Sequence, residues 1–257
     1  MGNCKIIENF DTKVIITLAL AENYGEPALD SSEEAAVYEV LEAINPEINW
    51  KSSYPDNLCV GGPHGIVCEI DKDDKEWHIV EINLGWVSEY SNNPICGRNA
   101  SFSPSILKFP LLRKLFFYKC FTSDAQLTVI PPYIWTLGSH LQELVFQDNP
   151  SLYGILSADI GNLVRLKRLI LTGTNVGGAL PAEIGRLKGL QQLVPSGNLF
   201  NGSIASDVGE LRDLVILDLR NNRLHGQVPR ELGKLQKLSK LDVSLNKLSD
   251  IIPDSLG

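Results

Sequence analysis

The sequence predicts an α/β fold: a right-handed solenoid of short repeats, with a parallel sheet on its concave face and a helical cap at the N-terminus. A pattern of apolar residues recurs with a fixed period, because Leu166 and Leu190 begin successive copies 24 residues apart, and Leu214 and Leu238 begin the next two. A period of this length is typical of repeat solenoids. Ahead of the repeats, apolar residues at helical spacing predict the helix of the cap.

The copy that begins at Leu214 shows how one repeat forms a strand and then turns. Alternation around Leu217 and Leu219 predicts a short strand with these two side chains pointing inward. Asn222 ends the strand, and its amide can both donate to and accept from backbone groups at the turn. In the other units the same column holds Cys120, Asn149, Thr174, Asn198 and Asn246. Because one unit cannot bury its own apolar face, the repeats are expected to stack and share a core.

Seven units are predicted over residues 79–257, with starts at residues 79, 112, 141, 166, 190, 214 and 238. The first is followed by an irregular insertion that runs to about Pro110. In the fifth, Pro195 stands where the pattern wants the second inward Leu, and proline lacks the N–H that an interior strand donates. Either the ladder of the sheet is interrupted there, or the nitrogen faces a position that needs no bond. The last unit stops at Gly257 without a polar capping repeat, so the chain is expected to be the front of a longer protein.

Two segments precede the repeats: residues 1–21, predicted to be a signal peptide, and residues 22–78, predicted to be the cap. Residues 14–21 form an apolar run that ends in the sequence ALA, as at a secretory cleavage site. The run is too short to span a bilayer. The opening sequence MGNC indicates an alternative, an N-terminal lipid on Gly2 and Cys4. The secretory interpretation is preferred because it agrees with the rest of the chain.

The cap is predicted to open with a helix over residues 31–45, with capping chemistry at Ser32 and apolar residues at helical spacing after it. Trp50, Cys59, Gly65 and Cys68 follow this helix. A cap of this kind would cover the edge of the first strand, which otherwise remains open to pairing with another chain.

The repeat segment L-x-G-x-I-P resembles the plant extracellular subclass of leucine-rich repeat proteins, and the resemblance covers about residues 34–257. Longer segments, among them PHGIVC and LRKLFFYKCF, are similar to the receptor-like group that includes Piriformospora indica-insensitive protein 2. The resemblance implies a non-catalytic recognition module without a kinase of its own, acting in plant defence or symbiosis signalling. It also implies that the protein is secreted or lies on the extracellular face of the plasma membrane. Membrane association would come only through segments absent from this chain or through the N-terminal lipid.

The five cysteines are interpreted with this resemblance in hand. The family's cap motif implies a disulfide between Cys59 and Cys68, and their short spacing in a secreted protein agrees with it. The motif's Trp before Gly65 is missing, since Pro and His stand at positions 63–64. Cys96 and Cys120 stay open: Cys96 is free or pairs with Cys120, which also fits the asparagine column as a buried thiol.

Composition and motif searches predict no catalytic site, metal or cofactor. The formal charge is −8, with 18 acidic and 6 basic residues in 1–100 against 13 and 17 in 101–257. Such a distribution lacks the concentrated basic face of a nucleic-acid footprint, and it is interpreted as solvated surface of both signs. The histidines are scattered over the cap and the return loops, at His64, His78, His140 and His225. Two glycosylation sequons occur, at Asn99 and Asn201.

The predicted binding surface is the concave face, where two rows of outward side chains run across the strands. The first row is Phe116, Val145, Ile170, Val194, Asp218 and Asp242, and the second is Tyr118, Gln147, Thr172, Ser196, Arg220 and Ser244. Val and Ile at such positions also simply favour strands, but contiguous apolar residues tend to mark contact sites. The hypothesis is that a peptide or a partner ectodomain packs on the apolar part of the first row, with a basic group toward Asp218 and Asp242.

Protein or peptide ligands, with a co-receptor ectodomain as a further partner, are therefore expected. Three alternatives remain from the sequence. The first is an apoplastic inhibitor of a microbial cell-wall-degrading enzyme, since polygalacturonase inhibitors are built from the same repeat. The second is the ectodomain fragment of a receptor kinase. The third is an intracellular scaffold anchored through Gly2 and Cys4.

Overall fold

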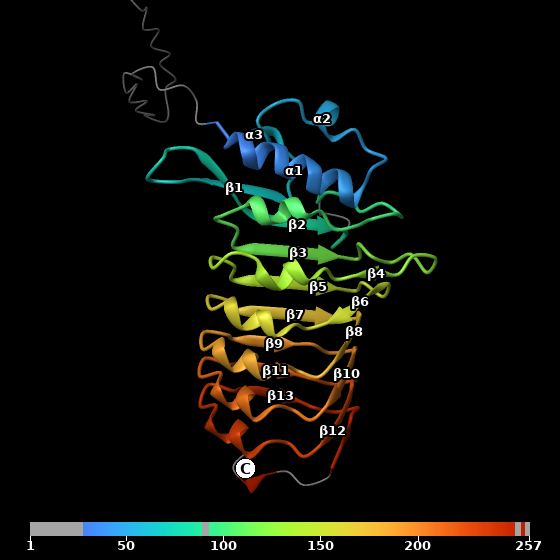
Figure 1. Cartoon of the computed structure of the whole chain (residues 1–257), viewed down its shortest axis with the longest axis vertical. Coiled ribbons are helices and arrows are strands. Elements are labelled where there is room, and N and C mark those ends of the chain that lie inside the picture. The colour runs from blue at the N-terminus through green and yellow to red at the C-terminus, as the bar shows by residue number, and fades with distance from the viewer. Residues whose placement is uncertain (1–27, 89–92, 250–252, 255–257) are drawn as a thin grey trace, which may run out of the picture.

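A computed structural model describes residues 28–88, 93–249 and 253–254 of the 257-residue chain (Figure 1). The predicted signal peptide and the alternative lipid sites at Gly2 and Cys4 lie outside the described residues. Within the described ranges, no helix has both the length and the apolar character needed to cross a membrane.

The cap contains three helices: α1 (Ser31–Ile44), α2 (Trp50–Ser53) and α3 (Leu58–Gly61). The capping residue of α1 is Asp30 and not Ser32. The Oδ1 of Asp30 accepts hydrogen bonds from the backbone N–H of Ser32 at 3.0 Å and of Glu33 at 2.9 Å. The carboxylate of Asp30, one residue before the helix, satisfies free N–H groups of the first turn, so the capping residue lies two positions before the predicted one while the helix begins at the predicted Ser31. The buried side chains of α1 belong to the same apolar core as those of the first strands.

One sheet of eight strands holds the predicted repeats together. It runs in the order β1 (Ile66–Ile70), β2 (Trp77–Gly85), β3 (Lys114–Tyr118), β5 (Glu143–Gln147), β7 (Arg168–Thr172), β9 (Gln192–Val194), β11 (Ile216–Asp218) and β13 (Lys240–Asp242). β1 is antiparallel to β2, and all the later neighbours are parallel. The six strands from β3 onward lie within the predicted units that start at residues 112 to 238, and β2 begins at Trp77, two residues before the predicted first unit, so the sequence period places the repeats of the sheet correctly.

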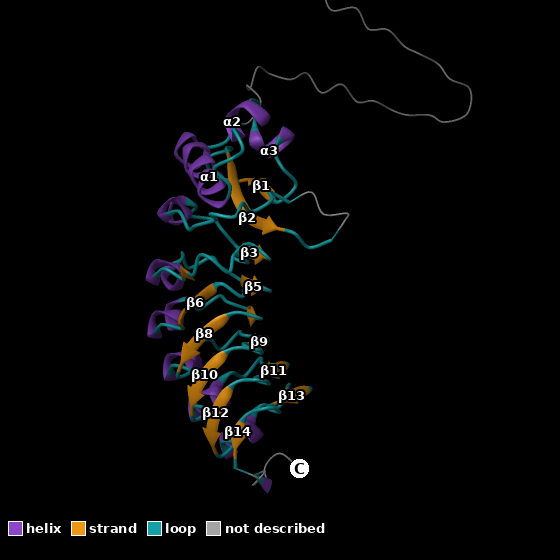
Figure 2. Ribbon diagram, turned by 90° about the vertical axis from the view of Figure 1, so that its right-hand side faces the viewer, coloured by secondary structure: helices purple, strands orange, loops and turns teal. Residues whose placement is uncertain are grey.

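The return path of each repeat adds a second sheet and a row of 3₁₀ helices. The second sheet contains β4 (Thr128–Val129), β6 (Leu152–Ile155), β8 (Asn175–Gly178), β10 (Leu199–Gly202), β12 (Arg223–Gly226) and β14 (Lys247–Leu248). The 3₁₀ helices are η1 (Pro104–Lys108), η2 (Pro132–Thr136), η3 (Ala158–Asn162), η4 (Ala182–Arg186), η5 (Ser206–Glu210) and η6 (Arg230–Lys234). Figure 2 shows these helices on the side opposite the eight-stranded sheet, toward which the stack bends. That sheet therefore lines the concave face.

The asparagine column forms the predicted hydrogen-bond ladder. The Oδ1 of Asn222 accepts from the N–H of Phe200 in the preceding repeat at 3.0 Å, and its Nδ2 donates to the carbonyl of Pro195 at 2.8 Å. Asn149 and Asn246 bond in the same direction, each to the repeat before it. Each asparagine thus satisfies backbone groups that its neighbour's turn leaves buried, which links consecutive repeats.

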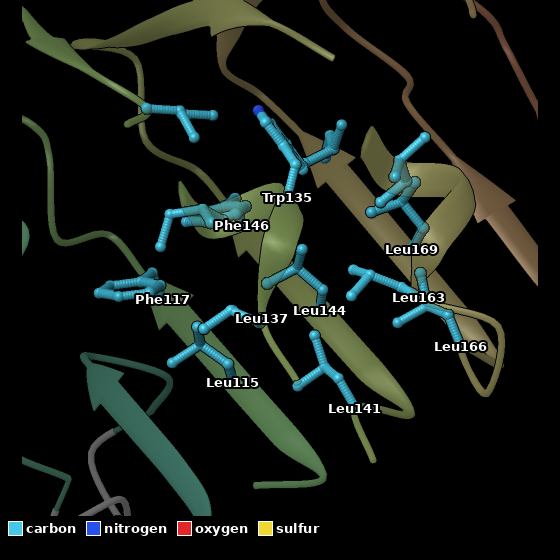
Figure 3. Close-up of a cluster of buried hydrophobic side chains, with 14 of the residues drawn as sticks. Leu115, Phe117, Trp135, Leu137, Leu141, Leu144, Phe146, Leu163, Leu166 and Leu169 are labelled. Carbon is cyan, nitrogen blue, oxygen red and sulfur yellow. The ribbon is translucent and has the colours of Figure 1, made fainter. Parts of the chain in front are cut away.

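Two kinds of core lie beneath the sheet. In the later repeats, leucines fill the inward positions, and Leu217 and Leu219 are fully buried. In the earlier repeats, aromatic rings replace several of them. The rings of Phe117 and Phe146 stack with centroids 5.2 Å apart (Figure 3), and Phe102 from the inserted segment packs against both.

The described part of the chain contains two disulfides, one at the predicted cysteine pair and one at the pair that the sequence left open. Cys59 and Cys68 are bonded, with Cα atoms 5.4 Å apart, which confirms the pairing that the family resemblance implied. Cys96 is bonded to Cys120, so the alternative of a free Cys96 is wrong. This second bond attaches the inserted segment to the turn after β3.

Pro195 interrupts the ladder, as one of the two sequence interpretations requires. At the equivalent position one repeat later, the N–H of Leu219 donates to the carbonyl of Asp242 at 2.7 Å. Pro195 has no N–H, and the pairing of β9 with β11 is confined to two residues of each strand. Pro195 is nevertheless buried, and its carbonyl accepts a hydrogen bond from the side-chain amide of Asn222.

Candidate functional site

The register of the sheet brings the first predicted row together. Phe116 pairs with Val145, Val145 with Ile170, and Ile170 with Val194, each in a neighbouring parallel strand. Asp218 pairs with Asp242 in the same way. Since neighbouring strands lie about 4.8 Å apart, the four apolar members form a continuous stripe across the concave face.

Burial is uneven along this stripe. Phe116 is 9% exposed and Val145 only 2%, whereas Ile170 and Val194 are partly exposed. Tyr118 covers part of Phe116, because the two rings meet edge-to-face at 5.8 Å. The sequence period could not show that Phe116 is covered, because its burial depends on the length of the side chains in neighbouring positions. The part of the stripe most open to a partner is therefore Ile170 and Val194.

A third row, which the sequence reading did not single out, lies two residues before the first row in each strand and is charged. Glu81 Oε2 lies 3.0 Å from Lys114 Nζ, and Glu143 Oε2 lies 2.6 Å from Arg168 Nη1. Arg168 also donates to Gln192 at 3.3 Å. These alternating charges neutralise one another across consecutive strands, so this edge of the concave face presents ion pairs and no net charge.

The acidic end of the first row is also paired within the chain. Asp218 is 3% exposed, and its Oδ2 lies 3.3 Å from Lys240 Nζ and 3.5 Å from Arg220 Nε. Hydrogen bonds from Ser244, with the charges of Arg220 and Lys240, hold the pKa of Asp242 below its ordinary value. Both carboxylates already have cationic partners, which argues against the predicted basic group of a ligand at this place. The groups that face solvent here are the cations.

The second row is polar and mostly open. Gln147, Arg220 and Ser244 are exposed, and Tyr118 and Thr172 are partly exposed. Ser196 differs from the others because it is only 3% exposed. Burial raises the pKa of the Tyr118 hydroxyl above its ordinary value, so this phenol stays neutral and can both donate and accept a hydrogen bond.

One feature at the cap end of the concave face was missed by sequence reasoning. Trp86, directly after β2, is 45% exposed, and the ammonium of Lys119 lies 4.4 Å from the centre of its ring. Lys119 follows Tyr118 in a turn with a positive φ of 49°. The sequence shows both residues, but only the pairing of β2 with β3 brings them together.

The remaining predicted sites lie apart from this face. Asn99 and Asn201, the two glycosylation sequons, are both exposed. Asn201 lies on β10 of the second sheet. In the described part of the chain, no three His, Cys, Asp or Glu side chains are arranged to hold a metal ion.

Comparison with known proteins defines the class to which this fold belongs. The family described as leucine-rich repeat region matches residues 93–256. The chain therefore belongs to the leucine-rich repeat proteins.

Several Arabidopsis thaliana proteins are similar to it in sequence. Protein TOO MANY MOUTHS is 36% identical over 139 residues, which is 54% of this chain and 27% of that protein. Piriformospora indica-insensitive protein 2 is 35% identical over 148 residues, 57% of this chain and 34% of its own length. Receptor like protein 29 is 34% identical over 153 residues, 59% of this chain and 32% of its own. The matched part thus spans about a third of each relative.

Solved structures agree with the fold. The complex of PEPR1 with AtPEP1 superposes with a TM-score of 0.68 at 22% identity, over 88% of this chain and 29% of that one. Pollen Receptor Kinase 3 gives a TM-score of 0.63 at 22% identity, over 86% of this chain and 100% of the other. A TDR receptor is 34% identical over 61% of this chain and 26% of its own, with a TM-score of 0.54.

Proposed function

We propose that this chain is a non-catalytic, extracellular recognition module of a plant receptor-like protein that binds a peptide or protein ligand on its concave face. The observation that carries the proposal is the register of Phe116, Val145, Ile170 and Val194, which forms one apolar stripe over four consecutive strands. Ion pairs border the stripe on one side and neutral polar side chains on the other. An apolar centre with a polar rim is the usual composition of a protein–protein interface.

The similar proteins support this reading. Receptor like protein 29 and Piriformospora indica-insensitive protein 2 are relatives over part of their length. The solved RGFR1 structure, 26% identical to this chain with a TM-score of 0.52, is described as a plant peptide hormone receptor in complex with RGF2. By analogy with these similar proteins, the proposal includes a role in defence or symbiosis signalling and a co-receptor ectodomain as second partner. Secretion and glycans on Asn99 and Asn201 belong to the same proposal.

The test uses variants at the open part of the stripe, because Phe116 and Val145 are too buried to be changed without loss of stability. Synthetic secreted signalling peptides of plants are screened by surface plasmon resonance against the wild type, Ile170→Asp and Val194→Asp. A peptide ligand is expected to lose at least about tenfold in affinity in both variants, since a carboxylate in an apolar contact leaves an unpaired charge.

A matched control is Val164→Asp, because Val164 is 56% exposed and precedes β7 outside the stripe. All variants should keep the melting temperature of the wild type. Ligands that bind both Asp variants as well as the wild type would remove the site from the concave face. Inhibition of a secreted polygalacturonase that survives in both variants would support the inhibitor alternative.

A further inference from the structure

Three side chains form a corner where the inserted segment meets the concave face: Trp86, Tyr118 and Lys119. We name this set the aromatic corner. The ring of Tyr118 is in edge-to-face contact with Phe116, the first member of the apolar stripe. The ammonium of Lys119 lies over the ring of Trp86 at 4.4 Å. The corner is therefore continuous with the proposed ligand surface and extends it toward the cap.

The corner is held in place from both sides. The N–H of Trp86 donates to the carbonyl of Tyr118 at 3.0 Å, and the N–H of Gly85 donates to the carbonyl of Pro94 at 2.8 Å. The disulfide between Cys96 and Cys120 ties the inserted segment to the turn that carries Lys119. An exposed indole on such a fixed frame does not need to be ordered when a partner binds, which lowers the entropic cost of binding.

The charge of the corner defines the chemistry of its partner. Lys119 is exposed, and in the described part of the chain no carboxylate forms an ion pair with it. Asp148 occupies the next turn, where its Oδ1 lies beside Gly173, and it forms no ion pair with Lys119 in the described part of the chain. The neighbouring members of the second row, Gln147 and Thr172, are neutral. An ammonium beside an exposed indole fits a carboxylate that stands next to an aromatic or aliphatic side chain.

We propose that the aromatic corner anchors one end of an extended peptide segment in which an acidic residue adjoins an aromatic or aliphatic residue. The carboxylate pairs with Lys119, and the apolar side chain packs on Trp86 and Tyr118. The proposal rests on the proposed function, because it assigns one end of the same ligand surface. With one end anchored at the corner, the rest of the peptide segment runs along the apolar stripe toward Ile170 and Val194.

The experiment selects a displayed library of random linear peptides on the immobilised chain. Binders are then measured on Trp86→Ala, Lys119→Glu, Lys119→Arg and Ile170→Asp, all first matched to the wild type in melting temperature. Selected peptides are expected to share an acidic residue beside an aromatic or aliphatic one, and to lose at least about tenfold in affinity on Trp86→Ala and Lys119→Glu. Lys119→Arg should retain binding. Exchange of the acidic residue for lysine in the peptide should restore binding to Lys119→Glu.

The matched control is Lys167→Glu, because Lys167 is an exposed lysine that precedes β7 at the opposite end of the strands. Its binding should equal that of the wild type. Binders that weaken on Ile170→Asp and ignore the corner variants would overturn the corner and leave the proposed function standing. Binders insensitive to Ile170→Asp as well, or no binders from the library, would count against both.

Discussion

The two ends of the described solenoid are held together by different means. From β7 onward, consecutive repeats share columns of buried leucine and a ladder of asparagine amides. In the cap and the first three units, the links include two disulfides, stacked aromatic rings and a buried ion pair. A regular repeat obtains hydrogen-bond partners from a similar neighbour on each side, whereas a repeat next to the cap or the insertion lacks such a neighbour on that side and is held there by individual links.

Cys120 shows the difference at one position. It stands in the asparagine column, but the unit before it continues into the irregular insertion and offers no regular turn to bond. Its backbone N–H still joins the ladder of the following repeat, because it donates a hydrogen bond to Asn149 Oδ1 at 2.8 Å. Its side chain instead forms the disulfide with Cys96 in the insertion. Cys120 thus continues the hydrogen-bond ladder toward the following repeat, and a disulfide replaces the ladder on the side of the insertion.

The largest predicted effect concerns the buried ion pair of the cap. Glu33 is 1% exposed; its Oε1 lies 2.6 Å from His78 Nδ1, and its Oε2 accepts from the N–H of Ile79 at 2.8 Å. His78→Leu leaves this carboxylate buried without its cation, so the free energy of unfolding should fall by about 3–5 kcal/mol at neutral pH. Urea unfolding measures the loss, and His64→Leu, at an exposed histidine, is the control.

The same pair gives a pH dependence with a defined sign. Burial alone would lower the pKa of His78, but hydrogen bonds and charges from Glu33 and Asp74 outweigh it and raise the pKa from 6.5 to about 9. Because the folded pKa is the higher one, the stabilisation is complete below pH 6.5 and is lost as the pH rises through about 9. The difference in melting temperature between wild type and His78→Leu should therefore shrink from pH 6 to pH 10. A constant difference would mean that the link is uncharged.

The two disulfides rank next, and their loop lengths set the order. Cys59 and Cys68 are 9 residues apart, and Cys96 and Cys120 are 24 apart. On the chain-entropy relation, replacing both cysteines by serine should cost about 2.7 kcal/mol for the first pair and about 3.5 kcal/mol for the second. Guanidinium unfolding of the two double variants tests the order. A reversed order would show that native contacts of the cap outweigh the loop entropy.

Sequence reasoning recovered the periodic part of the molecule and missed what depends on particular neighbours. The strands, the inward leucines and the asparagine column follow from spacing, because each repeat meets a copy of itself. The link from Glu33 to His78 spans 45 residues with no repeat to relate them. The covering of Phe116 by Tyr118 and the pairing of Asp218 with Arg220 and Lys240 depend on how far long side chains reach across the sheet, which spacing does not encode.

The asparagine ladder should be the main link of the later repeats. Asn222→Ala leaves the N–H of Phe200 and the carbonyl of Pro195 buried without this partner, so we expect a loss of about 2–3 kcal/mol. Among the described members of the later column, only Thr174 forms no side-chain hydrogen bond to the preceding repeat; its hydroxyl donates to Asn198. Thr174→Asn should therefore gain up to about 1 kcal/mol. Urea unfolding of both variants measures these changes in the free energy of unfolding. A destabilised Thr174→Asn variant would show that the turn at this position has no room for an amide.

The last prediction is a gain in stability at Pro195, where the leucine pattern of the regular repeats is broken. Pro195 is buried at the second inward position, where Leu171 and Leu219 stand in the flanking repeats. Pro195→Leu would restore the N–H that Leu219 uses to reach the next strand, and would extend the leucine column by one member. One added backbone hydrogen bond and the extra buried apolar area should raise the free energy of unfolding by about 1.5 kcal/mol.

Thermal and urea unfolding of Pro195→Leu, with Pro195→Ala beside it, separate the two contributions. Alanine restores the N–H without filling the core, so it isolates the backbone bond. If the leucine variant is stabilised and the alanine variant is not, packing accounts for the gain. If both are destabilised, the carbonyl that the Asn222 amide binds depends on the proline ring for its position, and the interruption of the ladder is part of how this repeat is built.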